Sequence, residues 1–259
     1  VKDERIAMLS FTGSDKVGWH LKAICGKKKV ALELGGNASV IIDEGTDLAA
    51  AAKSVAMGAN LYAGQTCIST QRIYVVKSAH DAFRDLLVKE FGALKSGDPN
   101  DPSVSVGPII DKGHFERIGT WVDEAVKGGA TVLAGGKAID TERNIYAATL
   151  LSHTNSEMKV NCAEVFGPVA VIEEVKDFRE AITKVNDSTY GLQAGVYTNS
   201  IAHMKLAHEE LEVGGIIINS IPGFRIDSMP YGGVKDSGLG REGLKYAMEE
   251  MSEPRLIVY

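Results

Sequence analysis

The stretch VALELGGNASVIIDEGTDLAAAAKSVAMGANLY, residues 30–62, decides the fold class. It contains two short apolar runs, Val30–Leu34 and Ser39–Ile42, which have the length of buried strands. An Ala-rich run then continues to Tyr62, and Asp47 stands before it where a helix N-cap is expected. Strands that alternate with helices predict an α/β fold with a largely parallel sheet flanked by helices.

The same alternation continues on both sides of this stretch. Further strands are expected at Ile6–Phe11, Arg72–Val76, Thr131–Ala134, Val169–Val175, Ala194–Tyr197 and Gly215–Asn219. Helices are expected from Ser14 to about Ile24 and over Asp81–Lys95, Phe115–Lys127, Phe178–Asn186 and Ile201–Leu211. The proline-rich segment Gly97–Pro108 predicts a loop.

Composition excludes several classes of protein. The 259 residues are 44% hydrophobic, which is enough for a substantial core, and the net charge of −6 argues against a nucleic-acid partner. No apolar run approaches the roughly 18 residues of a membrane helix, so no membrane association is expected. The 3 cysteines lack CxxC spacing and the 6 histidines are scattered. This pattern favours a reducing, cytoplasmic setting and predicts no metal site.

Two glycine-containing runs carry reactive side chains. Glu33-Leu34-Gly35-Gly36 offers a carboxylate, and Gly64-Gln65-Thr66-Cys67 offers a thiol. In each run the glycines allow the backbone to approach a ligand closely. A thiol that attacks and a carboxylate that activates water are the two groups that acyl chemistry through a thioester requires.

A third glycine motif is misleading. Gly238-Leu239-Gly240-Arg241-Glu242-Gly243 matches the GxGxxG dinucleotide fingerprint. It does not follow a convincing strand, and only 259 − 243 = 16 residues remain after it. Because the fingerprint needs a helix, a second strand and an acidic residue after it, we do not interpret this motif as a cofactor site.

Several ordered motifs together resemble the NAD(P)-dependent aldehyde dehydrogenase superfamily. Besides the two reactive runs they are Phe11-Thr12-Gly13-Ser14, Gly97-Asp98-Pro99, Val106-Gly107-Pro108, Glu164-Val165-Phe166-Gly167-Pro168, Tyr190-Gly191-Leu192 and Pro230-Tyr231-Gly232-Gly233. Members of that family are roughly twice as long, and the chain resembles their C-terminal half. The resemblance implies NAD or NADP as cofactor and a small-molecule aldehyde as substrate.

The resemblance also implies a role for each reactive group. Cys67 matches the nucleophile that forms a thiohemiacetal and then a thioester, and Glu33 matches the general base that hydrolyses the thioester. A cysteine of ordinary pKa is only a few per cent thiolate at neutral pH, so we expect the site to favour the anion. The other interpretations are a small buried cysteine and a salt-bridged carboxylate. Cys25 and Cys162 match no catalytic position and are interpreted as packing residues.

The cofactor-binding residues implied by the resemblance come from three places. Gly13 and Ser14 match the turn at a helix start that approaches the pyrophosphate. Leu34 and Gly35 match positions beside the nicotinamide ring. Glu164 and Phe166 match residues that hold the adjacent ribose, although Phe166 could also be a core residue.

The substrate side is the loop from Ile221 to Tyr231, which matches the family's aldehyde entrance. Arg225 and Tyr231 are the predicted substrate-binding residues, and an arginine at this place often meets an anion. A solvated or ion-paired Arg225 is the alternative. The loop and the end of the chain look most like the branch that acts on lactaldehyde and other small polar aldehydes. Asn219 is expected to have a structural role.

The resemblance divides the chain into three parts. Residues 1–35 are the expected remnant of a Rossmann-like NAD(P)-binding domain, 36–247 the catalytic domain, and 248–259 an oligomerisation strand of a homodimer or homotetramer. The adenosine-binding strands would precede Val1, so the chain by itself is expected to have little dehydrogenase activity. A cofactor-independent thiol esterase using Cys67 and Glu33, and a non-catalytic domain, are the alternatives.

Overall fold

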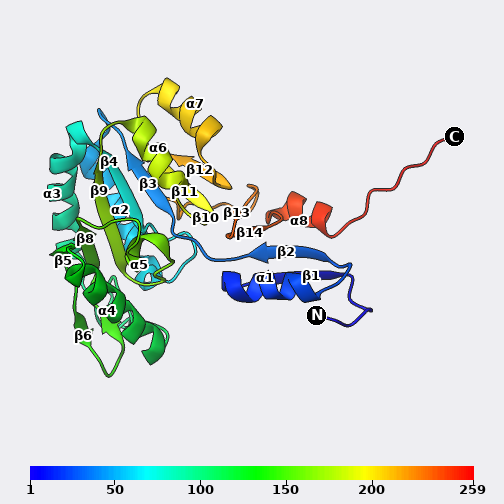
Figure 1. Cartoon of the computed structure of the whole chain (residues 1–259), viewed down its shortest axis with the longest axis horizontal. Helices are drawn as coiled ribbons and strands as arrows, with labels where there is room; N and C mark the ends of the chain where they lie inside the picture. The colour runs from blue at the N-terminus through cyan, green and yellow to red at the C-terminus, as the bar shows by residue number, and fades with distance from the viewer.

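The computed structural model describes all residues, 1–259, and contains a large and a small α/β unit. Figure 1 shows the large unit as a sheet covered by helices, with the small unit beside it. The two units are connected by the segment between β2 (Lys29–Glu33) and β3 (Ser39–Ile42). This segment contains the Leu34-Gly35-Gly36 run, so a predicted site lies where the units meet.

The large unit is built on a seven-stranded sheet with the order β12-β11-β3-β4-β9-β8-β5. All neighbouring strands are parallel except the β5–β8 pair. Its strands besides β3 are β4 (Arg72–Val76), β5 (Thr131–Ala134), β8 (Thr149–Ser152), β9 (Val169–Val175), β11 (Gln193–Tyr197) and β12 (Gly215–Ile218). The predicted parallel α/β sheet is therefore confirmed.

Helices cover both faces of this sheet. They are α2 (Leu48–Asn60), α3 (Lys77–Ala93), α4 (Lys112–Lys127), α5 (Lys159–Cys162), α6 (Phe178–Asn186) and α7 (Ile201–Glu210). The chain passes from β3 through α2 to β4 in one direction, and from β9 through α6 back to β11 in the other. Right-handed crossovers therefore place α2 and α6 on opposite faces. A core of 45 buried residues fills the space between these layers.

The small unit is a three-stranded sheet with the order β1-β2-β14. Strand β1 (Met8–Thr12) is parallel to β2, and β14 (Gly238–Leu239) is antiparallel to it. Helices α1 (Asp15–Ile24) and α8 (Leu244–Glu250) complete the unit. β14 contains the first residues of the GxGxxG match and pairs antiparallel with β2, so the motif does not follow a parallel strand as the dinucleotide fingerprint requires.

The short elements were missed by the sequence patterns. They are β6 (Ala138–Asp140), β7 (Ile145–Tyr146), β10 (Tyr190–Gly191), β13 (Val234–Lys235) and the 3-10 turn η1 (Leu61–Gly64), together with β8, β14, α5 and α8. Strands of two or three residues are too short to show a period, and only their pairing partners define them. Helix α3 also begins at Lys77, four residues before the predicted start.

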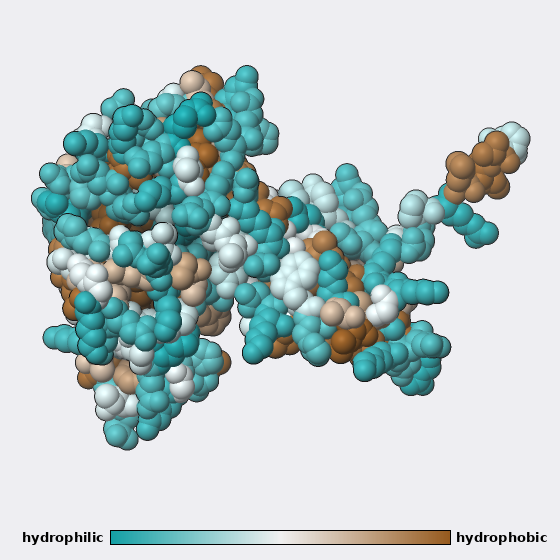
Figure 2. All heavy atoms as spheres, in the orientation of Figure 1, coloured by the Kyte–Doolittle hydropathy of each residue, from teal (hydrophilic) through white to brown (hydrophobic).

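The last residues extend away from both units. Residues 252–259 contain no regular element, and the apolar side chains of Leu256, Ile257 and Val258 are 80% exposed or more. Figure 2 shows them as a separate hydrophobic segment at the C-terminal end. The only ion pair of this segment joins Glu253 to Lys29 at 3.0 Å. None of the helices has the length and apolar character needed to span a membrane.

Candidate active site

Glu33 is held at the carboxyl end of the central strand of the small sheet. In the pairing register it lies between Thr12 of β1 and Gly238 of β14. The Glu33 carbonyl accepts a hydrogen bond from the Gly13 N–H at 3.0 Å, and the next amide, that of Leu34, donates to the Ser237 carbonyl at 2.9 Å. The backbone on both sides of Glu33 is therefore fixed, and its side chain points into the region between the two units.

The Glu33 carboxyl group is buried without a compensating partner. The residue is only 7% exposed, and its Oε2 atom has no hydrogen bond. Burial, followed by the nearby charge of Glu242, raises the pKa of Glu33 to about 8, against the opposing charges of Arg225 and Arg241. A buried carboxyl with a raised pKa is a common sign of a functional acid or base.

Cys67 follows a tight turn at the end of the Ala-rich helix. Tyr62, Ala63 and Gly64 all have positive φ, between 51° and 71°, which reverses the chain direction after α2. A Cβ atom on Gly64 would overlap the Gly167 carbonyl oxygen, so this turn packs directly on the FGP motif. The close approach explains why the first position of the GQTC run requires a glycine.

The Cys67 thiol is half-buried and contacts one side chain. Its Sγ atom lies 3.2 Å from the Tyr231 hydroxyl. Burial raises the pKa of Cys67, the Tyr231 hydrogen bond lowers it, and the charges of Glu164 and Glu33 raise it further. Within this chain the predicted preference for the thiolate is therefore absent, because only the phenol among these side chains favours the anion.

The two reactive runs come together with Glu164 at the connection between the units. A Cβ atom on Gly36 would overlap the Cys67 carbonyl oxygen, and one on Gly35 would lie 2.7 Å from Glu164 Oε2. The Gly36 N–H donates to Glu164 Oε1 at 2.8 Å. Burial raises the pKa of Glu164 to about 7, although this hydrogen bond lowers it. Residues that are far apart in the sequence thus form one site.

The remaining predicted cofactor residues lie around this connection. Ser14 caps α1 by accepting from the Val17 N–H at 3.4 Å, and both Ser14 and Gly13 are exposed. Phe166 is half-buried and has a positive φ of 49°. A Phe166 that belonged to the core would be fully buried, so its exposure fits a surface that receives a ligand.

These residues fit the nicotinamide end of NAD(P). Gly35 and Gly36 allow the backbone to lie directly against Glu164 and Cys67, and Glu164 offers a carboxylate that can accept from ribose hydroxyls. The orphaned Oε2 of Glu33 lies beyond them on the same segment.

Arg225 is ion-paired, which was one of its two sequence interpretations. Its Nη2 atom lies 2.7 Å from Glu242 Oε2, and its guanidinium carbon lies 4.2 Å from the centre of the Tyr231 ring. The side chain is still 38% exposed. Arg225 and Tyr231 therefore lie together beside Cys67, and the rest of the guanidinium is accessible.

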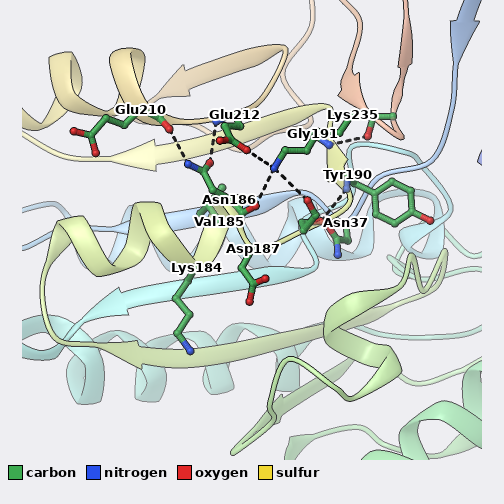
Figure 3. A network of polar contacts seen from close by, with 12 residues as sticks. Asn37, Lys184, Val185, Asn186, Asp187, Tyr190, Gly191, Glu210, Glu212 and Lys235 are labelled. Atoms are coloured by element: carbon green, nitrogen blue, oxygen red, sulfur yellow. Dashed lines mark hydrogen bonds and ion pairs between the residues drawn. The ribbon is translucent and has the colours of Figure 1, made fainter.

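A polar network behind the site holds the glycine segment in place. Figure 3 shows Asn37, Asn186, Tyr190 and Gly191 close together where the large sheet meets the β10–β13 pair. Asn37 donates to the Asn161 carbonyl at 2.9 Å and accepts from the Ser188 hydroxyl at 2.8 Å. Because Asn37 directly follows Gly36, these bonds fix the position of the Gly36 amide that holds Glu164.

The side chain of Lys235 connects the end of the predicted substrate loop, Ile221 to Tyr231, to the same network. It pairs with Glu212 at 2.6 Å and donates to the Asn186 carbonyl at 2.9 Å, as Figure 3 shows. Strand β13 contains Lys235 and follows the Tyr231-Gly232-Gly233 run, so this anchor limits the movement of Tyr231.

Three residues that affect the site were not predicted from the sequence. Arg241 and Glu242, which belong to the misleading glycine motif, set the charge around Glu33. Gly232 is the third, since a Cβ atom there would lie 3.0 Å from Glu33 Oε1. The signal for Gly232 was its place in the PYGG motif, but the pairing partner of that motif could not be inferred from sequence.

The two other cysteines and Asn219 lie away from these contacts. Cys25 is buried, as expected for a packing residue, whereas Cys162 is exposed and the prediction that it packs in the core is wrong. Asn219 accepts from the Thr198 N–H at 3.0 Å, after the end of β12, which agrees with a structural role.

The fold and this grouping of a thiol, carboxylates and glycines are typical of an enzyme. Comparison of the chain with known proteins identifies the family. Residues 1–257 match the model of the aldehyde dehydrogenase family, and the chain belongs to this family. The expectation drawn from the ordered motifs is confirmed.

Two curated relatives show which members of the family this chain is similar to. The 3-sulfolactaldehyde dehydrogenase of Priestia megaterium is 44% identical over 258 residues, which are 100% of this chain and 54% of the relative. The lactaldehyde dehydrogenase of Methanococcus maripaludis is 41% identical, over 99% of this chain and 54% of the relative. The chain thus spans about half the length of the curated relatives that it matches.

Solved structures give the same result for the fold. Glyceraldehyde-3-phosphate dehydrogenase GapN from Methanocaldococcus jannaschii, complexed with NADP, superposes with a TM-score of 0.92 at 41% identity. The match covers 97% of this chain and 54% of that chain. Aldehyde dehydrogenase 21 from Physcomitrella patens, in complex with succinate, has a TM-score of 0.91 at 40% identity over 96% of this chain and 51% of that chain.

Proposed function

We propose that this chain carries the catalytic thiol and general base of an NAD(P)-dependent enzyme that oxidises a small polar aldehyde to a carboxylic acid. The observation that carries the proposal is the packing of the Glu33–Gly36 run against the Cys67 backbone, with Glu164 bound to the Gly36 amide. The names of the relatives, which act on sulfolactaldehyde and lactaldehyde, support the same chemistry.

In this proposal Cys67 begins the reaction. Its sulfur adds to the aldehyde carbon and forms a thiohemiacetal, and the Cys67 backbone N–H can face the resulting oxyanion. The turn of positive-φ residues before Cys67 supports this step because it fixes the sulfur at the connection between the units. Tyr231 lies within hydrogen-bond distance of the same sulfur.

Glu33 completes the reaction as general base. A carboxylate with a pKa of about 8 binds a proton more strongly than an ordinary glutamate, so it is better suited to take a proton from water during thioester hydrolysis. Its unpaired Oε2 atom is available for that water. Gly232 supports the arrangement, since a side chain there would press on the Glu33 carboxylate.

The cofactor would be held by the predicted residues at the nicotinamide end, Leu34, Gly35, Glu164 and Phe166, with Gly13 and Ser14 toward the pyrophosphate. When bound, the nicotinamide accepts the hydride that leaves the aldehyde carbon. The chain's own contribution is the close packing that Gly35 and Gly36 allow, which brings the Glu164 carboxylate and the Cys67 backbone to the same place.

Substrate selection is assigned to Arg225 and Tyr231. Only Nη2 of Arg225 is engaged by Glu242, so the remaining N–H groups can meet an anionic or hydroxylated end of the aldehyde. In the full-length enzyme, Arg225→Ala is expected to lower kcat/KM at least tenfold for sulfolactaldehyde and far less for a neutral aldehyde. An equal loss for both aldehydes would contradict a role in selecting the substrate.

The decisive experiment is covalent trapping. The full-length enzyme is incubated with aldehyde and NAD(P) and digested, and the peptides are analysed by mass spectrometry. We expect an acyl adduct on Cys67, with none in Cys67→Ser and more of it in Glu33→Gln, because hydrolysis of the thioester slows. An adduct on Cys25 or Cys162 instead would refute the proposed function.

The predicted oligomerisation strand, 248–259, begins inside α8, so we further propose that only its exposed part, residues 252–259, forms this strand in a cytoplasmic homodimer or homotetramer. The support is their apolar, unpaired state, since such a segment is normally covered by a sheet edge. Deleting residues 254–259 should lower the mass of the assembly measured by light scattering. An unchanged mass would refute the role of this segment.

A further inference from the structure

The contact between Cys67 and Tyr231 is part of a chain of side chains. Tyr231 is 4% exposed, and its hydroxyl lies 3.2 Å from the Cys67 sulfur. On the other side of the ring, the Arg225 guanidinium carbon lies 4.2 Å from the ring centre. Glu242 holds that guanidinium at 2.7 Å.

The backbone fixes the same group of residues. The Tyr231 N–H donates to the Glu242 carbonyl at 3.0 Å, and the Glu242 N–H donates back to the Tyr231 carbonyl at 2.6 Å. The residue that orients Arg225 is therefore paired directly with the residue on which Arg225 stacks. This reciprocal pair positions the phenol toward Cys67 and the cation over the ring face.

We propose that Tyr231 is a catalytic residue that donates a hydrogen bond to the Cys67 thiolate, and that Arg225, held by Glu242, is a positioning residue that strengthens this donor. This inference deepens the proposed function and rests on Cys67 being its nucleophile. It gives Tyr231 a role at the sulfur, in addition to contact with the substrate.

The direction of the hydrogen bond follows from the two ionisations. A thiol and a phenol can each donate to the other, but a thiolate can only accept. Burial and the neighbouring Cys67 raise the pKa of Tyr231 above its usual value, so the phenol keeps its proton while the thiol ionises. Hydrogen bonds to a charged acceptor are stronger than neutral ones, so the bond stabilises the thiolate form.

Arg225 acts on this bond through the ring. A cation over an aromatic face withdraws electron density from the ring, and this makes the phenol a stronger donor. Glu242 keeps the guanidinium over the ring instead of letting it swing into solvent. Glu33 and Glu164 also face the thiol, and both oppose its ionisation. Among these neighbours, the phenol is the group that offsets them at the sulfur.

The test measures thiol ionisation without aldehyde or NAD(P). Cys25→Ala and Cys162→Ser are introduced so that Cys67 is the only thiol, and its alkylation by iodoacetamide is followed from pH 6 to pH 10. Tyr231→Phe removes the hydroxyl and keeps the ring. Tyr62→Phe is the matched control, because Tyr62 is 74% exposed and makes no contact with the sulfur.

Tyr231→Phe is expected to raise the midpoint of the alkylation profile by about one pH unit or more, as loss of a charge-assisted hydrogen bond predicts. Arg225→Gln should raise it by about half as much, and Tyr62→Phe should leave it unchanged. An unchanged midpoint in Tyr231→Phe, with circular dichroism confirming a folded protein, would overturn the proposal.

A double-mutant cycle separates the role of Arg225 from a direct charge effect on the sulfur. If Arg225 acts through the phenol, Arg225→Gln has no further effect in the Tyr231→Phe background. An equal shift in both backgrounds would overturn the positioning role. These outcomes are also distinguishable from failure of the proposed function, since a Cys67 that is never acylated by aldehyde can still show the Tyr231-dependent midpoint.

Discussion

Replacing Glu33 with glutamine should stabilise the fold while removing the proposed general base. Burial raises the pKa of Glu33 from 4.5 to about 8, so between these two pH values the folded chain holds a proton that the unfolded chain has released. The stability contributed by this proton is complete below about pH 4.5 and is lost as the pH rises to about 8. Glutamine is neutral throughout and avoids this loss.

The magnitude follows from the size of the shift. Converted in full, a shift from 4.5 to about 8 corresponds to about 5 kcal/mol of unfolding free energy. Partial contact with solvent and the charges of Arg225 and Arg241 reduce the cost of ionising Glu33. We therefore expect Glu33→Gln to gain about 2 kcal/mol at pH 8.5 and almost nothing at pH 5.

Urea denaturation of the wild type and Glu33→Gln at pH 5 and pH 8.5 checks this prediction. Glu142→Gln is the control, because Glu142 is exposed and has no side-chain partner, so its effect should be near zero at both pH values. A Glu33→Gln variant that is equally stable to the wild type at pH 8.5, or that shows the same change at both pH values, would refute the buried-carboxyl reasoning.

Three further predictions concern the packing and chemistry of Cys67. Gly36→Ala places a methyl group against the Cys67 carbonyl, so it should cost about 1–3 kcal/mol in urea denaturation and slow Cys67 alkylation. Cys67→Ser should abolish hydrolysis of p-nitrophenyl acetate, which the isolated 259 residues are expected to catalyse. The same isolated chain should form little or no NAD(P)H from an aldehyde, because the proposed cofactor residues do not include any for the adenosine.

Each of these three predictions has a result that would contradict it. Gly92→Ala is the control for Gly36→Ala, since a Cβ atom on Gly92 meets nothing within 4 Å; a Gly36→Ala variant as stable as Gly92→Ala would contradict the packing argument. Ester hydrolysis that survives Cys67→Ser would remove the thiol from the mechanism. Rapid NAD(P)H formation by the isolated chain would show that the adenosine half is dispensable.

The sequence by itself determined the fold class and the reactive groups. Long elements such as α2, α4 and β9 have periodic or uninterrupted apolar patterns, because each buries a full face in the large sheet. Cys67 and Glu33 were predicted as nucleophile and general base because their glycine-containing motifs are local in the chain and resemble those of the family. Short pieces such as β8 and β14 have no such pattern, and they exist only because a neighbouring strand supplies their hydrogen bonds.

Tertiary structure alone decided how the site residues influence one another. That Gly36 touches the Cys67 backbone, that Tyr231 reaches the sulfur, and that Arg225 pairs with Glu242 are contacts between segments far apart in the sequence. The same contacts bury Glu33 and Cys67 and raise the pKa of each above its usual value. The sequence specifies the residue types. The burial and the charge environment of each residue depend on distances that only folding establishes.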